Sequence, residues 1–150
     1  MDKQTVDGLA WVRERPAQFF SRGRVEVVSL LAYLMSDVLE LGGGECRIST
    51  RDLWAFVASD IDWLRHERLS TVELFNRVVP APAHGEHSMR AEVLVNAFAT
   101  DVFTWAPEDR CSIRGNPPEE EILRAAVDLS WSRRVVAFRT GPPNDASARI

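Results

Sequence analysis

The sequence predicts an α/β (α+β) two-layer sandwich, in which helices cover one face of a mixed, mostly antiparallel sheet. Two observations lead to this fold class. Short segments of strand-like composition occur in neighbouring pairs, close enough in sequence to form hairpins. Helical segments stand between these pairs, in the order helix, helix, strand, strand, helix, helix, strand, strand, helix, strand. Hairpins placed between helices are typical of a sandwich whose helices gather on one side of the sheet.

The N-terminal part of the chain is predicted to be helical. Residues 5–13 place apolar side chains on one face at helical spacing, and Pro16 limits this helix because the residue before a proline avoids helical geometry. Residues 16–23 are predicted to form a loop. The next helix, residues 24–41, is apolar around most of its circumference, so we expect it to lie under other elements. The glycine run 42–44 ends it.

The middle of the chain predicts a hairpin and a short helix. Strands over residues 46–50 and 53–58 are joined by the charged turn Arg51-Asp52, which is not of the Asn-Gly type. A short helix over residues 71–78 is expected to end before Pro80.

The C-terminal half predicts the remaining elements. A helix is expected from about Ser88, whose hydroxyl can cap it. Strands follow over residues 102–105 and 110–114. A helix opened by prolines and glutamates runs from residue 117 to about 129, since acids in a first turn suit the helix dipole. The last strand covers residues 134–139.

Composition and charge favour one globular domain that does not bind nucleic acid directly. The chain has 150 residues, of which 45% are hydrophobic and 27% are charged, as in ordinary globular proteins. The net charge is −4, and acids and bases alternate without the basic stripe of a nucleic-acid binder. Residues 1–140 are predicted to form the domain, and residues 141–150 a flexible tail.

The sequence predicts a cytoplasmic protein with no membrane partner. The N-terminus has no apolar run behind a basic start, as a signal peptide would have. The longest apolar stretch, Val25–Leu41, is interrupted by polar and charged residues and is therefore a helix of the protein core rather than a membrane span. Cys46 and Cys111 lie far apart in sequence, and in such a compartment they are expected to be reduced thiols.

Four stretches together carry a resemblance to a known family. They are Val12–Phe20 (VRERPAQFF), Leu41–Gly43 (LGG), Ser59–Leu64 (SDIDWL) and His87–Phe98 (HSMRAEVLVNAF). In this order they resemble motifs of the GHKL-type ATP-binding domain, shared by gyrase B, the ninety-kilodalton heat-shock chaperone, histidine kinases and MutL. The resemblance is closest to gyrase B and covers roughly residues 10–106. It implies a Bergerat-like sandwich, which is the fold class that the order of elements predicts.

The residues that hydrolyse ATP in this family are missing. The resemblance places the family's catalytic glutamate at Leu31 and its Mg²⁺-binding asparagine at Met35. General-base catalysis needs a carboxylate, and phosphoryl transfer needs a metal to neutralise developing charge. No catalytic residue is therefore assigned. Asp37 or Glu40, elsewhere on the same helix, are the alternative carboxylates.

The nucleotide pocket that the resemblance implies is also altered. The adenine-binding aspartate aligns on Ser59, and Asp60 fits only after a shift of one residue, which turns a strand residue to the other face. Ile61, Trp63 and Arg90 stand where the family has glycines that let backbone approach the nucleotide. We name Ser59, Asp60, Trp63 and Arg90 as a remnant nucleotide pocket and expect no cofactor, with ATP and Mg²⁺ as the alternative.

The sequence leaves a metal site and several functions as alternatives. His84 and His87 lie in a loop with proline and glycine and lack the fixed spacing of a helical zinc motif, so we expect a surface loop and no metal. The favoured function is a degenerate gyrase-B-like domain without ATP hydrolysis, which binds a ligand, another protein or a second copy of itself. An ATPase with relocated carboxylates is the alternative, and an unrelated α/β domain with an accidental resemblance is the third.

Overall fold

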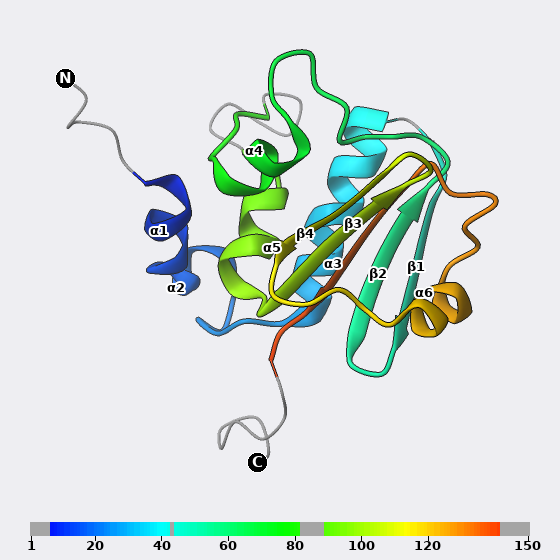
Figure 1. Ribbon diagram of the computed structural model, residues 1–150. Coiled ribbons are helices and arrows are strands. Elements are labelled where there is room, and N and C mark those ends of the chain that lie inside the picture. Colours follow the sequence, from blue (N-terminus) through cyan, green and yellow to red (C-terminus); the bar gives the residue numbers. More distant parts are fainter. Residues whose placement is uncertain (1–6, 43, 82–88, 142–150) are drawn as a thin grey trace.

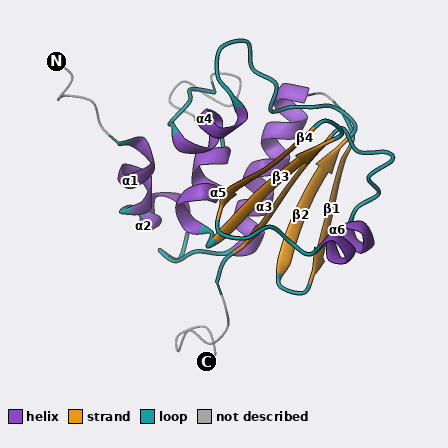
Figure 2. Cartoon of the chain, in the orientation of Figure 1, coloured by secondary structure: helices purple, strands orange, loops and turns teal. Residues whose placement is uncertain are grey.

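The computed structural model describes residues 7–42, 44–81 and 89–141 of the chain. Two layers make up this structure, a sheet and a set of helices that lie along it (Figures 1 and 2). The strands are β1 (Cys46–Arg51), β2 (Trp54–Ser59), β3 (Asp101–Ala106), β4 (Asp109–Arg114) and β5 (Arg134–Arg139). The helices are α1 (Gly8–Arg13), α2 (Pro16–Phe19), α3 (Val27–Asp37), α4 (Thr71–Asn76), α5 (Glu92–Phe98) and α6 (Glu120–Ala126). The predicted α/β two-layer sandwich is confirmed.

The strands form one sheet in the order β1-β2-β5-β3-β4, and every pair of neighbours is antiparallel. The sheet of the described residues therefore has no parallel pair, although the prediction allowed for a mixed sheet. β5 lies between the two hairpins and joins them, with Val57 opposite Val136 on one side and Thr104 opposite Val136 on the other. The last strand in sequence thus completes the middle of the sheet.

The burial of the strands follows their place in the sheet. The central strands β2, β5 and β3 are buried along almost their whole length, whereas the edge strands β1 and β4 are largely exposed. Strands that are covered on both faces carry continuous runs of apolar side chains, as β2 (WAFVAS) and β5 (RVVAFR) do between their polar ends. This pattern indicates that the sheet has cover on both sides.

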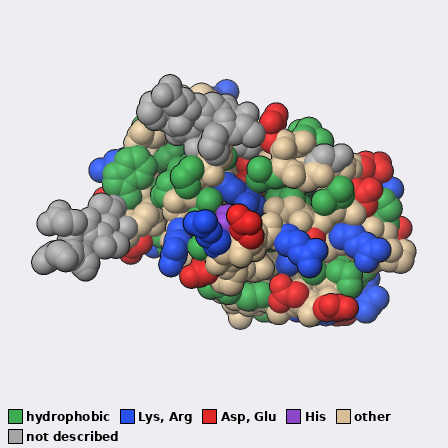
Figure 3. Space-filling view, turned by 90° about the horizontal axis from the view of Figure 1, so that it is seen from above, with side chains coloured by type: hydrophobic (Ala, Val, Ile, Leu, Met, Phe, Trp, Pro, Cys, Tyr) green, Lys and Arg blue, Asp and Glu red, His purple; other side chains and the backbone are tan. Residues whose placement is uncertain are grey.

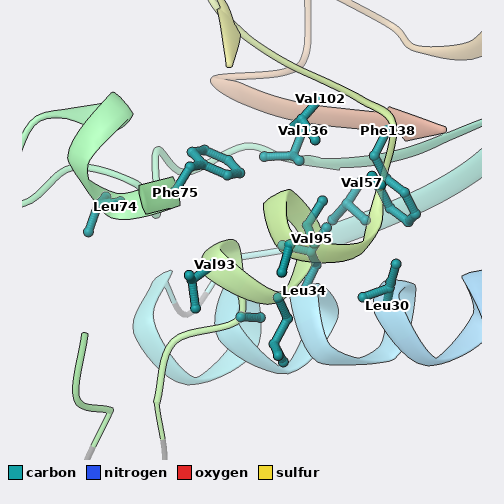
Figure 4. Packing of buried hydrophobic residues seen from close by; sticks show 14 of the residues in the cluster. Leu30, Leu34, Val57, Leu74, Phe75, Val93, Val95, Val102, Val136 and Phe138 are labelled. Atoms are coloured by element: carbon teal, nitrogen blue, oxygen red, sulfur yellow. The ribbon is translucent and has the colours of Figure 1, made fainter. Parts of the chain in front are cut away.

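The main core lies between the sheet and the helices α3 and α5. Leu30 and Leu34 of α3, with Val93 and Val95 of α5, pack toward the strand residues Val57, Val136 and Phe138, and Figure 4 shows these side chains converging. α1 and α4 contact α5. A second core on the opposite face buries Phe56, Phe103 and Trp105 of the sheet under Leu123 and Val127 of the α6 segment. The sequence predicted helices on one face of the sheet only, whereas α6 lies on the other face.

Several predicted boundaries differ from the structure. The predicted loop 16–23 contains α2, which begins at Pro16, where a missing N–H costs nothing because first-turn donors have no partner inside the helix. The single helix expected over residues 24–41 is α3 followed by a π-helical segment, Val38–Gly42. The helix expected over residues 117–129 is the shorter α6.

The helix expected from Ser88 is also shorter, because α5 begins only at Glu92. Met89 pairs instead with Pro80 in an isolated antiparallel bridge. Ser88 itself lies outside the described residues, as does the predicted tail from residue 142 onward. No helix among the described residues combines the length and the apolar character that crossing a membrane requires.

The β1–β2 hairpin turns without the glycine that such turns favour. Its central residues, Asp52 and Leu53, have φ angles of 52° and 71°, which is the left-handed conformation at both turn positions. This conformation matches the twist of the two strands, and it is the reason that two-residue hairpin turns usually hold Asn-Gly or Asp-Gly. Leucine is disfavoured there, because its Cβ crowds the backbone.

Candidate functional site

Three separated segments meet beside the C-terminal end of α3. They are the end of the π-helical segment at Gly42 with the nearby Gly44, the residues that follow β2, and the residues that precede α5. A Cβ atom added to Gly44 would lie 2.5 Å from Oδ1 of Asp60, and one added to Gly42 would lie 3.4 Å from Cβ of Trp63. Glycine permits this close packing, since it has no side chain.

A cluster of buried polar side chains joins the same segments. We call Asp37, Trp63, Arg90 and Glu92 the Arg90 cluster. Nε of Arg90 donates to Oε1 of Glu92 at 2.9 Å and lies 3.8 Å from Oδ2 of Asp37. Nη2 of Arg90 donates to the backbone oxygen of Trp63 at 3.2 Å, and Nε1 of Trp63 donates to Oε2 of Glu92 at 3.2 Å. Each residue therefore bonds to at least one other segment of the chain.

The Arg90 cluster also satisfies the start of α5. The cap residue Ala91 has no side chain that could accept a hydrogen bond, so Oδ2 of Asp37, on α3, accepts from the Ala91 N–H at 2.8 Å instead. A carboxylate at this position satisfies a donor that the helix itself leaves unpaired. The N–H of Arg90 donates to the oxygen of Val79 at 2.7 Å, so this backbone is held on both sides. Asp37 thus links α3 to α5.

Burial controls the charge of the two carboxyl groups. Glu92 is fully buried and Asp37 is 2% exposed. Burial raises the pKa of Glu92 to about 8, with the neighbouring Asp37 carboxylate as a further cause. Burial raises the pKa of Asp37 as well, while its hydrogen bonds with Glu92 and with the Ala91 N–H lower it. Two carboxyl groups can hydrogen-bond to each other only if one keeps a proton. The two carboxyl groups therefore share one proton at neutral pH, next to the positive charge of Arg90.

The structure brings together part of the residue set expected from the sequence. Three residues that were named for separate reasons, Asp37, Trp63 and Arg90, belong to the Arg90 cluster. Ser59 lies buried at the end of β2, where its hydroxyl accepts from the Ile61 N–H at 3.1 Å. Asp60 is exposed, and its Oδ1 accepts from the Glu45 N–H at 2.9 Å. Neither makes a hydrogen bond or ion pair with the Arg90 cluster among the described residues.

The other expected positions lie outside the cluster. Glu40 is exposed on the π-helical segment. Leu31 and Met35 are half-buried on α3, and Leu31 packs against the main core. His84 and His87 lie outside the described residues. Within the described residues, no group of three or more His, Cys, Asp or Glu side chains could hold a metal ion.

Sequence reasoning missed Glu92 as a central residue of the site. The signal was present, because Glu92 is the only charged residue of α5 (EVLVNAF), whose remaining residues are apolar except Asn96, and it follows Arg90 by two positions. Charged residues are almost never fully buried without a partner, so an acid in such a helix needs a cation beside it. What the sequence did not provide is the long-range contact with Asp37.

A second charged cluster lies where the end of β2 meets β5. Arg134 is 4% exposed in its side chain and forms two bonds to Asp62, Nε to Oδ1 at 2.9 Å and Nη2 to Oδ2 at 3.1 Å. Its Nη1 donates to the hydroxyl of Thr104 at 3.1 Å and contacts Asp109 at 3.5 Å. These residues, here called the Arg134 cluster, were not singled out from the sequence.

The Arg134 cluster borders a cavity of about 320 Å³, which is also lined by Arg65, Arg133 and Glu108. Acidic and basic side chains lie side by side in this lining. Figure 3, which looks onto the molecule from above, likewise shows basic and acidic side chains interspersed over that face. This mixed surface lacks the single-sign field that would attract a polyanion.

The Arg90 cluster is a set of buried groups that bond to one another. Three cavities that described residues line lie elsewhere, at the Arg134 cluster and along α6. The cluster can fix the geometry between α3, α5 and the segment after β2, and it can take up or release a proton. Comparison of the chain with protein-family models, with curated proteins and with solved structures found no match.

Proposed function

We propose that this chain is a non-hydrolytic protein-interaction module of the cytoplasm, with the fold of a degenerate gyrase-B-like domain. One observation carries the proposal. Trp63 and Arg90, which stand where the resemblance expects glycines around a nucleotide, are buried and bonded to Glu92. Side chains that fill such a site and bond to one another replace the open glycine backbone that a phosphate or a base would approach. The cluster therefore supports a structural role for these positions.

The environment of α3 supports the loss of hydrolysis. Leu31 and Met35 have neither a carboxylate to activate water nor an oxygen to hold Mg²⁺. Asp37 is engaged with the Ala91 N–H and faces Arg90. A carboxylate held by a helix start and a cation is a poor base for an incoming water.

Thermal unfolding with nucleotides tests the proposal. ATP, ADP and GTP, each at millimolar concentration and with or without Mg²⁺, are expected to leave the midpoint of unfolding unchanged. A ligand that binds the folded chain stabilises it by RT ln(1 + [L]/Kd), so that even weak binding raises the midpoint. A nucleotide-dependent rise that disappears in Trp63→Ala or Asp60→Ala would contradict the proposal.

An ATPase with relocated groups is the second candidate, and the protonation of the Arg90 cluster favours it. A buried carboxylate with a raised pKa is a common form of general base, and Asp37 has both features. This candidate predicts Mg²⁺-dependent release of phosphate from ATP by the wild-type chain and none by Asp37→Asn. Glu67→Gln, at an exposed position to which no role is assigned, serves as the matched control.

A further inference from the structure

The cavity beside the Arg134 cluster lies at one end of the sheet. In the register of the strands, Ser59 of β2 lies opposite Arg134 of β5, and Ala106 of β3 lies opposite Asp109 of β4. The ends of β2 and β3 and the start of β5 therefore meet at the same end of the sheet (Figure 1). The segment after β2, the turn between β3 and β4 and the start of β5 line the cavity, whose volume is about 320 Å³.

Three charged side chains of this lining have no partner among the described residues. Arg65, Arg133 and Glu108 are exposed, and their side chains form no ion pair or hydrogen bond with any residue that the structure describes. Asp62, by contrast, is engaged with Arg134 through both carboxylate oxygens. Opposite charges attract, so the lack of an ion pair between Glu108 and the two free arginines indicates that the cavity separates them.

The free basic side chains and the free acid enter the cavity from different elements. Arg65 belongs to the segment after β2 and Arg133 directly precedes β5, whereas Glu108 lies in the turn between β3 and β4. In the sheet, β5 separates β2 from β3. The cavity therefore has a basic side, toward β2 and β5, and an acidic side, toward the β3–β4 turn, where Asp109 also lies.

Buried hydrogen bonds hold the floor of the cavity in place. The side chain of Arg134 is 4% exposed and bonds to both carboxylate oxygens of Asp62, at 2.9 and 3.1 Å. The Arg133 N–H donates to the backbone oxygen of Ser59 at 2.8 Å, and the Arg65 N–H donates to that of Asp62 at 3.3 Å. The backbone that carries the two free arginines is therefore fixed, so that binding a ligand there loses less conformational entropy.

We propose that this cavity binds a small zwitterion, a molecule with one carboxylate and one ammonium group, of the size of a dipeptide. Arg65 and Arg133 hold the carboxylate, because a guanidinium group donates paired N–H bonds to the two oxygens of such a group. Glu108 holds the ammonium group, with Asp109 as a second acceptor on the same side. This site is separate from the Arg90 cluster and adds a small-molecule ligand to the proposed function, on which it does not depend.

The balance of charge favours a zwitterion over a simple ion. The basic residues of the lining are as numerous as the acidic ones, with Arg65, Arg133 and Arg134 against Asp62, Glu108 and Asp109. An anion at the two free arginines would also face the acidic side, and a cation at Glu108 would face the basic side, so that like charges weaken the binding of either. A molecule with both charges meets an opposite charge at each end.

The spacing of the two sides favours a dipeptide over a single amino acid. A volume of 320 Å³ lies at the lower end of the roughly 300–1,000 Å³ of small-molecule pockets. Neighbouring strands lie about 4.8 Å apart, so the ends of β2 and β3, with β5 between them, are about 10 Å apart. In an α-amino acid one carbon atom separates the two charged groups, whereas a peptide unit adds about 3.8 Å to this distance.

Titration of the ¹⁵N-labelled chain with L-alanyl-L-alanine, followed by nuclear magnetic resonance, is the primary experiment. Amide signals within residues 62–65, 106–109 and 133–134 should shift, with a dissociation constant of about 1–10 mM, as expected for so small a ligand. N-acetyl-L-alanyl-L-alanine and L-alanyl-L-alaninamide each lack one charge and should bind at least about fivefold more weakly. Free L-alanine, whose charges lie closer together, should also bind more weakly than the dipeptide.

Single substitutions locate the two charged groups of the ligand. Arg133→Gln and Glu108→Gln should each raise the dissociation constant of the dipeptide at least about fivefold. Both residues are exposed, so circular dichroism should show unchanged folding. Glu108→Gln should also abolish the preference for the dipeptide over its acetylated analogue, because the ammonium group then has lost its acceptor. Arg22→Gln and Glu121→Gln are the matched controls, since both residues are exposed and lie outside the lining, and these variants should bind as the wild type does.

The possible outcomes separate this site from the proposed function. Signals that stay in place at the highest dipeptide concentration, or that shift only outside the cavity, overturn the site. Equal binding of the acetylated analogue by the wild type overturns the zwitterion, because the cavity then binds anions alone. Unchanged binding by both Arg133→Gln and Glu108→Gln overturns the roles of these residues. Nucleotide binding in the thermal unfolding experiment would contradict the proposed function and leave the result on the dipeptide unaffected.

Discussion

Among the residues that the structure describes, Arg90 and Arg134 are buried, and their surroundings differ in the exposure of their acidic partners. Arg90 is 7% exposed in its side chain and faces Glu92 and Asp37, whose side chains are 0% and 2% exposed. Arg134 is 4% exposed, but its acidic partners Asp62 and Asp109 are 33% and 48% exposed. Both arginines are therefore buried. Their acidic partners are buried in the Arg90 cluster and partly exposed in the Arg134 cluster.

This difference determines which cluster responds to protonation and to mutation. Carboxylates at a rim keep part of their hydration, so that they can be solvated when their partner is removed. Fully enclosed carboxylates have only the protein to stabilise their charge, and one of the two in the Arg90 cluster takes a proton instead. The loss of folding free energy on mutation of each cluster therefore depends more on the exposure of the acids than on that of the arginine.

The largest effect is expected from removing the enclosed cation. Arg90→Met keeps much of the side-chain volume but leaves Asp37 and Glu92 buried without a positive charge, which should destabilise the fold by about 3–5 kcal/mol. Urea unfolding followed by tryptophan fluorescence measures this loss. A change below about 1 kcal/mol would mean that water reaches the Arg90 cluster. The two clusters would then not differ in their access to solvent.

The second prediction uses the pH dependence of stability. The folded-state pKa of Glu92 is about 8, above its ordinary value of 4.5. Between these values the folded chain binds a proton that the unfolded chain has lost, so the free energy of unfolding should fall as pH rises, by at most about 1.4 kcal/mol per pH unit. The contribution is fully present below pH 4.5 and lost above about pH 8.

Glu92→Gln should flatten this slope, because glutamine does not titrate. Midpoints of thermal unfolding at pH 5.5, 7 and 8.5 for the wild type and the variant provide the measurement. Glu67→Gln, on an exposed segment, is the matched control and should keep the wild-type slope. An equal slope in all three chains would show that the enclosed carboxyl pair does not carry the pH dependence.

A smaller loss of stability is expected at the Arg134 cluster. Arg134→Met removes the bidentate contact with Asp62 and the bond to Thr104, and the half-exposed acids can turn to solvent. The expected loss is about 1–3 kcal/mol, less than for Arg90→Met in the same urea experiment. If Arg134→Met lost more unfolding free energy than Arg90→Met, the exposure of the acids would not set the relative stability of the two clusters.

The smallest effect is expected from the most exposed acid. Asp109 contacts Arg134 at 3.5 Å and is 48% exposed, so Asp109→Asn should change the free energy of unfolding by no more than about 0.5 kcal/mol. Chemical denaturation beside the wild type is sufficient to test this. A loss above about 1 kcal/mol would show that the rim is less solvated than its exposure indicates.

Local patterns predicted the elements of the fold better than their ends. The β1–β2 hairpin lies within one residue of its predicted position, because apolar strand segments and a short connection leave little freedom. The start of α5 was placed too early, since Met89 takes part in a bridge with Pro80 that lies nine residues before it. The break of the long helix at Val38 was also missed. A pattern that is apolar on all sides does not mark where the helix geometry changes.

Only some of the residues of the candidate site were predicted, because local sequence features do not show which distant residues come into contact. Asp37 was named as an alternative catalytic carboxylate, and Trp63 and Arg90 were named because they stand where the resemblance has glycines. Their contact with Glu92 could not be predicted, because it joins residues up to 55 positions apart and depends on how α3 and α5 cross the sheet. The Arg134 cluster was missed because Asp62 and Arg134 are 72 positions apart.

The sequence by itself determined the two-layer α/β class, the hairpins and the apolar helix that α3 forms, because propensity and periodicity act over a few residues. The tertiary structure alone decided that β5 lies between the hairpins, that α6 covers the second face, and that Asp37 and Glu92 share an enclosed site. It also decided which charged residues line the cavity beside the Arg134 cluster. Such long-range contacts depend on packing and desolvation of the whole chain, which no local pattern contains.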